Sequence, residues 1–370
     1  MFKKLQGVEL VPEYRHKKAT LYRLDAKNLL NKYYIVTSEF TRKLLNSPEV
    51  VGFETYDCMC NPTKITLDYF NKKGLVHNAN ILTILRGGLN YPLEECCYRT
   101  GVAVNDMSFL SCERTFEGDF IVGLDIKYKK LSIIDKGTLM IGDIVATGDT
   151  LVRCLKYIVK EYRKAGASLR NIIFFTIGGN MGVTIMENLT EELQMYWPNF
   201  EGFHCVFVEG IFSNYTDKGV LGIQLPYVDF YWKDAILAPE YREQTLNDDD
   251  ALFEKCTIYD GGARRYEIPA HFREVTEYWE GVAKVAGSVN FKEFTDEKIG
   301  YKTPVGYGDW LELNHYTLLD SDLTHRLYEQ EQNFLEQNSH RTLKEIAERR
   351  LTEFKTAVGK YVDGCMISEE

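Results

Sequence analysis

Short runs of apolar residues alternate with helix-like segments through the middle of the chain. Residues 79–85, 107–112, 138–141, 172–177 and 204–208 are rich in branched or aromatic side chains. Such near-continuous apolar runs are typical of strands buried on both faces of a parallel sheet. The pattern therefore predicts an α/β fold with a mostly parallel sheet, in which ligands bind beyond the carboxyl ends of the strands.

A helix is predicted directly after the third of these strands. Apolar residues recur there at helical spacing, at Leu151, Leu155, Ile158, Val159 and Tyr162. They fall on one stripe, which Gly166 ends. The loop at residues 142–150 therefore joins the carboxyl end of a buried strand to the start of a helix.

The two flanks of this middle part have weaker patterns. Residues 1–75 contain mixed helix-like pieces, and we expect an N-terminal extension. This extension and the C-terminal tail are alternative candidates for a hood over the site. Beyond residue 240 the composition becomes polar and acidic, and residues 247–250 are expected to be a surface linker. Apolar spacing from Leu323 onward predicts long helices. We therefore divide the chain into an extension at 1–75, a core at 76–240 and a mostly helical extension at 241–370.

Composition and charge exclude several classes of protein. With 370 residues, 45% of them apolar and 13% aromatic, the chain is neither disordered nor a single small module. Its net charge of −10 repels polyphosphate backbones, so we expect no nucleic-acid partner. It has neither a membrane-length apolar stretch nor an apolar signal core, so we expect no membrane partner and a cytoplasmic location. The nine cysteines lack the paired spacing of zinc sites, so we expect mostly buried thiols.

A phosphate-binding pattern follows the strand at 138–141. The chain continues Gly142-Asp143-Ile144-Val145-Ala146-Thr147-Gly148-Asp149-Thr150. The Thr-Gly-x-Thr turn opens a helix, where N–H groups, hydroxyls and the helix dipole converge on one spot that suits a phosphate group. Asp143, at the end of the strand, is placed to accept hydrogen bonds from sugar hydroxyls. A plain helix cap is the alternative interpretation of the turn.

A second anion-binding pattern, Arg86-Gly87-Gly88, follows the strand at 79–85. Two glycines let the backbone approach an anion closely, and the Arg86 guanidinium adds a planar cation. The alternative is a surface arginine beside a turn. Both patterns follow predicted parallel strands, so we expect them at the same edge of the sheet.

The two patterns together resemble the type I phosphoribosyltransferases. In that family a Thr-Gly loop holds the 5-phosphate of phosphoribosyl pyrophosphate, adjacent acids hold its ribose, and an earlier loop holds its pyrophosphate. The resemblance implies that Arg86 and Asp143 are catalytic and that Asp143 lies beside Mg²⁺. It implies substrate binding by Gly87, Gly88, Ile144, Val145, Ala146, Thr147, Gly148, Asp149 and Thr150. Gly142 departs from the family because it replaces the first of two acids, whereas Ala146-Thr147-Gly148 is most similar to the adenine and uracil members.

The resemblance also implies a mobile lid. The polar stretch from Glu113 to Asp125 has the place of that lid in the chain, between the two anion loops. The candidate lid residues are Glu113, Arg114 and Glu117. For each of them, a solvated loop charge is the alternative.

A base-binding segment is expected after the last core strand, at residues 225–232. Aromatic rings there can stack on a heterocycle. The candidates are Tyr227, Phe230 and Trp232. Packing of the sheet edge is an equally weighted interpretation of Phe230 and Trp232.

The resemblance implies a magnesium-dependent transferase that moves a phosphoribosyl group from phosphoribosyl pyrophosphate to a nitrogenous base. Two alternatives stay open. One is a non-catalytic regulatory protein that binds phosphoribosyl pyrophosphate or a nucleotide, which Gly142 motivates, and the other is a nucleotide hydrolase on the same fold. The resemblance further implies a homodimer, and the acceptor base is not specified by the sequence.

Overall fold

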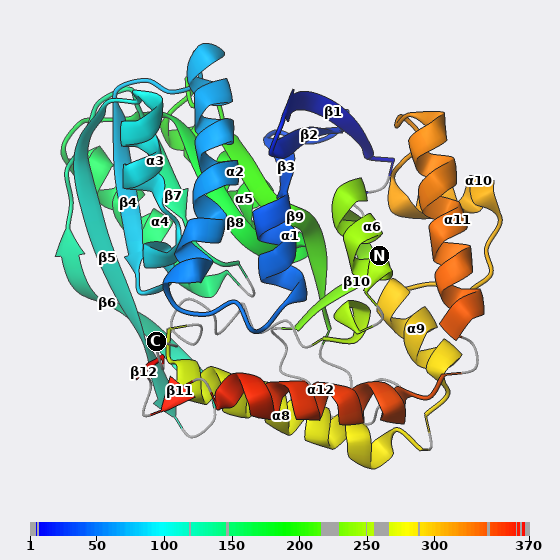
Figure 1. Ribbon diagram of the computed structural model, residues 1–370. Coiled ribbons are helices and arrows are strands. Elements are labelled where there is room, and N and C mark those ends of the chain that lie inside the picture. Colours follow the sequence, from blue (N-terminus) through cyan, green and yellow to red (C-terminus); the bar gives the residue numbers. More distant parts are fainter. Residues whose placement is uncertain are drawn as a thin grey trace.

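A computed structural model gives the fold of the chain (Figure 1). It describes residues 5, 7–117, 120–145, 148–215, 229–248, 250–254, 266–287, 289–338, 341–359, 361–362 and 365–366. None of the helices among these residues is long and apolar enough to cross a membrane.

A ten-stranded sheet forms the centre of the molecule. Its strands are β1 (Glu9–His16), β2 (Ala19–Asp25), β3 (Lys32–Ser38), β4 (Ala79–Leu85), β5 (Val104–Glu117), β6 (Phe120–Lys130), β7 (Gly137–Gly142), β8 (Leu169–Gly179), β9 (Phe203–Tyr215) and β10 (Asp229–Leu237). Their order is β1-β2-β3-β9-β8-β7-β4-β5-β6, and β10 pairs with β9. The six strands from β3 to β5 in this order are parallel, whereas β1, β2, β6 and β10 pair antiparallel. The predicted α/β fold with a mostly parallel sheet is confirmed.

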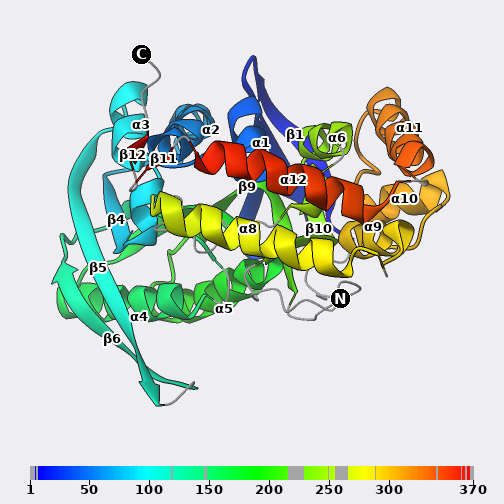
Figure 2. The ribbon, with the colours of Figure 1, turned by 60° about the horizontal axis from the view of Figure 1, so that its bottom comes forward.

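Helices cover both faces of this sheet (Figure 2). On one face lie α1 (Glu39–Asn46), α2 (Phe53–Lys72) and α3 (Leu93–Thr100), and on the other lie α4 (Asp149–Lys164) and α5 (Asn180–Tyr196). Because both faces are covered, every residue of β7 is buried. The predicted stripe is confirmed in α4, where Leu151, Leu155, Ile158 and Tyr162 are buried.

The described residues beyond β10 are mostly helical. They contain α6 (Pro239–Asn247), the short helix η3 (Ala251–Phe253), α8 (Ile268–Val285), α9 (Phe291–Ile299), α10 (Tyr307–Asn314), α11 (Ser321–Asn338), α12 (Leu343–Val358) and the strands β11 (Tyr361–Val362) and β12 (Cys365–Met366). From Leu323 onward the predicted long helices are confirmed as α11 and α12. The paired helices α8 and α12 lie along the edge of the sheet at which β4 and its parallel neighbours end (Figures 1 and 2). The C-terminal extension therefore faces the edge where ligands of such sheets bind.

Three local predictions need correction. The helix-like pieces expected in the N-terminal extension are present as α1 and α2, but three strands precede them, and β3 joins the central sheet beside β9. The polar stretch from Glu113 onward is not a loop, because β5 and β6 pair along it and place Glu113 opposite Asp125. The expected surface linker at 247–250 ends in a buried acid, since Asp250 is 8% exposed and lies 3.1 Å from the Arg350 guanidinium of α12.

Candidate functional site

The two expected anion loops lie side by side at the carboxyl edge of the sheet. Strands β4 and β7 are parallel neighbours, with Thr83 opposite Gly142. A Cβ atom added to Gly87 would lie 2.6 Å from the Asp143 carboxylate, and one added to Gly88 would lie 3.1 Å from the Gly142 carbonyl oxygen. Only glycine at position 87 therefore allows the backbone of one loop to touch the acid of the other.

Asp143 is a buried acid at the end of β7. Its backbone N–H donates to the Phe175 carbonyl at 3.1 Å, and its carboxylate accepts the Ile144 N–H at 2.9 Å. Burial raises the pKa of Asp143 to about 7, against the opposing effect of the Ile144 hydrogen bond. The carboxyl group therefore changes charge near neutral pH, and a cation or hydroxyl donor beside it would favour its ionised form.

The loop after Asp143 leads into the N-terminus of α4. Val145 is buried and fixed to the end of β8, because its carbonyl accepts the Gly179 N–H at 3.2 Å. Ala146 and Thr147 lie outside the described residues. Gly148 precedes α4 with a φ of 77°, and Asp149 and Thr150 form the first turn of this 16-residue helix. The free N–H groups and dipole of such a helix start attract anions.

Gly148 is required for steric as well as conformational reasons. Its positive φ is unfavourable for residues with a Cβ atom. A Cβ atom there would also lie 2.2 Å from the Ile185 side chain of α5. The residue that precedes α4 therefore packs closely against the Ile185 side chain of α5.

A close contact with Tyr91 explains why position 142 carries a glycine and not a second acid. A Cβ atom at position 142 would lie 2.3 Å from the Cβ of Tyr91, so the tyrosine occupies the space of any side chain there. Tyr91 is 3% exposed, and its hydroxyl accepts the Ile177 N–H at 2.9 Å. The described residues thus place a single acid, Asp143, at the end of β7. Sequence reasoning missed Tyr91, whose only signal is that it closely follows the Arg-Gly-Gly loop.

Arg86 is exposed at the start of the short helix η2 (Gly87–Asn90) and pairs with an acid of the C-terminal extension. Its guanidinium lies 3.7 Å from the Glu267 carboxylate, and the two side chains are 74% and 53% exposed. Glu267 immediately precedes α8, whose first residue, Ile268, also lies close to Gly52. No signal in the local sequence links Glu267 to this loop.

The candidate lid residues lie on an arm formed by β5 and β6, which extends past the body of the molecule (Figure 2). Glu113 is exposed, and Lys127 lies 3.6 Å from its carboxylate and 3.8 Å from that of Asp125. Arg114 and Glu117 lie on β5, with side chains outside the described part of the structure. The arm places charged residues at its base, beside the edge where β4 ends.

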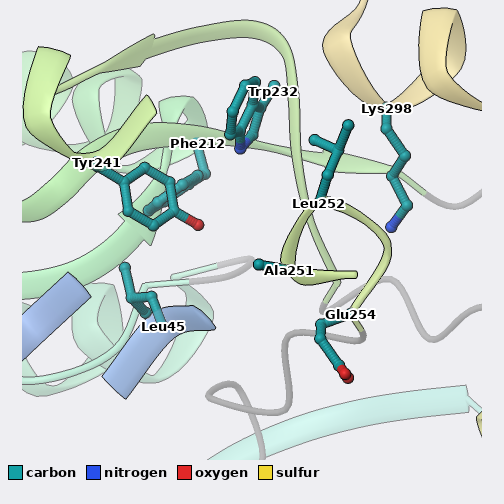
Figure 3. Close-up of a pocket in the computed structure, with 8 residues that line it drawn as sticks. All are labelled: Leu45, Phe212, Trp232, Tyr241, Ala251, Leu252, Glu254 and Lys298. Atoms are coloured by element: carbon teal, nitrogen blue, oxygen red, sulfur yellow. The ribbon is translucent and has the colours of Figure 1, made fainter. Parts of the chain in front are cut away.

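Of the three candidate base-binding aromatic side chains, the structure describes only that of Trp232. Tyr227 lies outside the described residues, and Phe230 lies on β10 with its side chain outside them. Trp232 is buried, with the Arg242 guanidinium 4.7 Å from its ring centroid. The cavity beside it has a volume of about 30 Å³, room for only a water molecule or two. It is lined by Leu45, Phe212, Trp232, Tyr241, Ala251, Leu252, Glu254 and Lys298 (Figure 3). This packing favours a core role for Trp232 over base stacking.

The donor atoms at the edge suit a cation that takes most of its ligands from a substrate. Among the described residues, no group of three or more His, Cys, Asp or Glu side chains is arranged to hold a metal ion. Asp143 supplies a carboxylate beside the Gly87 backbone. Mg²⁺ is commonly bound by one or two carboxylates together with substrate phosphates and water, so this donor set fits it.

Comparisons with known proteins give limited similarity. No protein-family model and no curated protein matches the chain. A hypoxanthine phosphoribosyltransferase from Staphylococcus aureus shares 15% identity over 35% of this chain and 67% of that chain, with a TM-score of 0.26. A hypoxanthine-guanine enzyme from L. donovani shares 13% identity over 37% and 78%, also at 0.26. Similarity at this level does not identify a family, so the function is argued from the motifs and the site geometry.

Proposed function

We propose that the chain binds phosphoribosyl pyrophosphate at the edge formed by β4, β7 and α4, and transfers its phosphoribosyl group to a nitrogenous base. The observation that carries the proposal is the contact between Gly87 and Asp143. It joins an Arg-Gly-Gly loop and an acid-to-Thr-Gly loop, which resemble phosphoribosyltransferase motifs, into one site in front of a helix N-terminus.

Each part of this site has a role in the proposed reaction. The first turn of α4 takes the 5-phosphate, and Asp143 accepts hydrogen bonds from the ribose hydroxyls. Breaking the anomeric C–O bond leaves positive charge on the sugar and negative charge on the pyrophosphate. Arg86 and the backbone N–H groups at 87 and 88 are the donors that would stabilise the negative charge of the departing pyrophosphate. Asp143 and substrate oxygens would hold Mg²⁺, which would further neutralise the pyrophosphate charge.

The cover over the site comes from the C-terminal extension. The helices α8 and α12 lie across the carboxyl edge, and the Arg86–Glu267 ion pair connects α8 to the pyrophosphate loop. A cover of this kind excludes water that would otherwise hydrolyse the sugar cation. In this proposal the arm of β5 and β6, which leaves the sheet beside the end of β4, is the candidate lid.

A non-catalytic sensor of phosphoribosyl pyrophosphate is the second candidate, and a specific observation favours it. Tyr91 excludes any side chain at position 142, so the site has lost one of the two acids that the resembling family uses. A binding protein needs fewer oriented charges than an enzyme that must stabilise a transition state. In this candidate, the ion pair to Glu267 passes ligand occupancy to the C-terminal helices.

Calorimetry with phosphoribosyl pyrophosphate and Mg²⁺, followed by a pyrophosphate-release assay with a panel of bases, tests both candidates. The transferase releases pyrophosphate with one of the bases, whereas the sensor binds the ligand without releasing it. Free base liberated from a nucleotide in the absence of pyrophosphate would indicate a hydrolase instead. No binding by calorimetry would overturn the whole proposal.

Two variants assign the roles. Arg86→Ala and Asp143→Asn are each expected to lose about 2–3 kcal/mol of transition-state stabilisation, the scale of one preorganised electrostatic contact. Arg99→Ala is the matched control, because Arg99 is an exposed arginine on α3 whose ion pair, among the described residues, is with Glu95 of its own helix. Parental turnover in both site variants would show that these residues have been misassigned.

A further inference from the structure

Two thiols meet behind the phosphate loop. The Sγ atoms of Cys112 and Cys154 lie 3.3 Å apart, although Cys112 belongs to β5 and Cys154 to α4. The sulfurs of a disulfide are about 2.0 Å apart, so a small movement brings these two within bonding distance. Cys154 is fully buried, whereas Cys112 is partly exposed. One thiol of the pair is therefore open to a soluble reagent, and the other is reached only through it.

The pair sits at the base of the arm formed by β5 and β6. The pairing of β4 with β5 ends at Leu85 and Ser111, immediately before Cys112. The register of β5 against β6 also shifts between Ser111 and Cys112. Such a bulge bends a strand, so Cys112 marks the point where the arm departs from the sheet.

The partner thiol lies on the helix whose first turn is expected to hold the phosphate. Cys154 is about 1.7 helical turns beyond Gly148, the residue that precedes α4. Burial raises the pKa of the Cys154 thiol, and the neighbouring Cys112 and the charge of Asp143 add to this effect. The charge of the candidate catalytic acid Asp143 therefore acts on the Cys154 thiol.

We propose that Cys112 and Cys154 form a reversible disulfide that locks the base of the arm onto α4. The oxidant is a small-molecule disulfide such as oxidised glutathione. The Cys112 thiolate attacks one sulfur of the reagent, forms a mixed disulfide and releases one reduced thiol. The Cys154 sulfur then attacks the Cys112 sulfur and breaks the mixed disulfide, and the Cys154 proton passes to the departing thiolate, which leaves as the second reduced thiol. Two electrons and two protons have then passed from the pair to the reagent.

The lock has a physical consequence for the proposed lid. Reduced, the arm is tied to α4 only by non-covalent contacts, and it can bend at the bulge. Oxidised, the bulge is fixed to the helix that begins at the phosphate loop, so closure over the ligand is restricted. The effect on ligand binding rests on the proposed function, whereas the disulfide and its effect on the arm do not.

Peptide mapping of the full chain, treated with oxidised glutathione, tests the bond itself. The expected product has lost two hydrogen atoms in mass and contains a peptide in which Cys112 is linked to Cys154. Cys112→Ser and Cys154→Ala should each abolish the link. Cys60→Ser should leave it intact, and it is the matched control because Cys60 is another partly exposed cysteine with a cysteine beside it, since the Cys96 thiol donates to the Cys60 carbonyl at 3.3 Å. A stable glutathione adduct on Cys112, or linkage only between Cys60 and Cys96, would overturn the proposal.

Hydrogen exchange tests the lock without reference to any ligand. Amide exchange in the arm should be about tenfold slower in the oxidised chain than in the reduced chain, and unchanged by oxidant in Cys112→Ser. Equal exchange in the linked and reduced chains would show that the bond locks nothing.

Calorimetry with phosphoribosyl pyrophosphate then separates the two proposals. Weaker binding by the oxidised chain, restored by a reducing thiol, supports a lock on the lid, and unchanged binding overturns that part. If the reduced chain itself fails to bind the ligand, the proposed function fails, while the mapping and exchange results still decide whether the lock exists.

Discussion

Tyr91 fills the space that a side chain at position 142 would occupy, because its Cβ lies 2.3 Å from the place of a Cβ on Gly142. The Tyr91 hydroxyl also accepts the N–H of Ile177, at the end of β8. One tyrosine, placed just after the Arg-Gly-Gly loop, therefore packs on the end of β7 and is hydrogen-bonded to the end of β8. Tyr91 therefore holds the ends of β7 and β8 in place. The type I phosphoribosyltransferases, which the motifs resemble, carry an additional acid at the position that corresponds to Gly142.

Gly142→Ala is therefore expected to destabilise the fold by about 1–3 kcal/mol, the usual cost of overpacking a closed core. Tyr91→Ala removes the obstruction but leaves a cavity, which costs roughly 3–5 kcal/mol. The double variant should lose less unfolding free energy than the sum of the two single losses, by about 0.5–3 kcal/mol. The reason is that the methyl group added by Gly142→Ala has room once the Tyr91 ring is gone. Urea denaturation of the four proteins measures this coupling, and additive losses would show that Tyr91 does not exclude a side chain at 142.

Gly148→Ala is expected to be more damaging than the same substitution at Gly166, although both glycines have a positive φ, 77° and 68° respectively. A Cβ atom at 166 meets nothing within 4 Å, so that variant pays only the backbone cost of about 1–2 kcal/mol. A Cβ atom at 148 also meets the Cδ1 atom of Ile185 at 2.2 Å, and moving the end of this side chain off its rotamer adds about 0.5–1.5 kcal/mol. Thermal or urea unfolding of the two variants gives the difference, and equal losses would contradict the proposed α4–α5 contact.

The strands of the core could be predicted because each is buried on both faces and is therefore apolar along its whole length. The placement of the two candidate anion loops at one edge followed, since parallel neighbours end at the same edge. The arm of β5 and β6 could not be separated from a loop, because an exposed hairpin with charges such as Glu113 and Lys127 has the composition of a loop. β3 carried a usable signal, the run Tyr33 to Val36, which is buried throughout.

The contacts that define the site in detail could not be predicted, because they join residues far apart in the chain. Nothing near Arg86 indicates that Glu267 lies beside it, and nothing near Gly142 indicates that Tyr91 packs on it. The acidic run ending at Asp250 was interpreted as a linker because its partner, Arg350, lies on the distant helix α12. Its local composition predicts that Asp250 is exposed, whereas the ion pair with Arg350 allows it to be buried.

Glu267→Gln is expected to strengthen the binding of phosphoribosyl pyrophosphate by about threefold at low salt, because the Glu267 carboxylate competes with the pyrophosphate for Arg86. The effect is small since both side chains are exposed and their ion pair is weak. Glu280→Gln is the control, because it removes the same charge from an exposed position on α8. Calorimetry at low and high salt measures the effect, which should vanish as salt screens the pair. Equal gains in both variants would indicate a general charge effect instead.

Asp143→Asn is expected to stabilise the fold at pH 8 while it weakens ligand binding. Burial raises the pKa of Asp143 in the folded chain to about 7, above its value in the unfolded chain. As the pH rises, the Asp143 carboxyl group loses its proton first in the unfolded chain, at about pH 4, and in the folded chain only near pH 7. The free energy of unfolding therefore falls between about pH 4 and pH 7 and stays at this lower value above pH 7.

Asparagine keeps an oxygen that can accept the Ile144 N–H but carries no charge, so the variant should gain on the order of 3 kcal/mol over the parent at pH 8 and much less at pH 5. Urea denaturation of both proteins at the two pH values gives the comparison. A difference in unfolding free energy that does not change with pH would mean that the carboxyl group is not buried as an acid with a raised pKa. With a raised pKa, Asp143 ionises between pH 6 and pH 8, so the affinity for phosphoribosyl pyrophosphate with Mg²⁺ should rise over this range. If Asp143 is instead already charged at pH 6, its ionisation would cause no such rise in affinity.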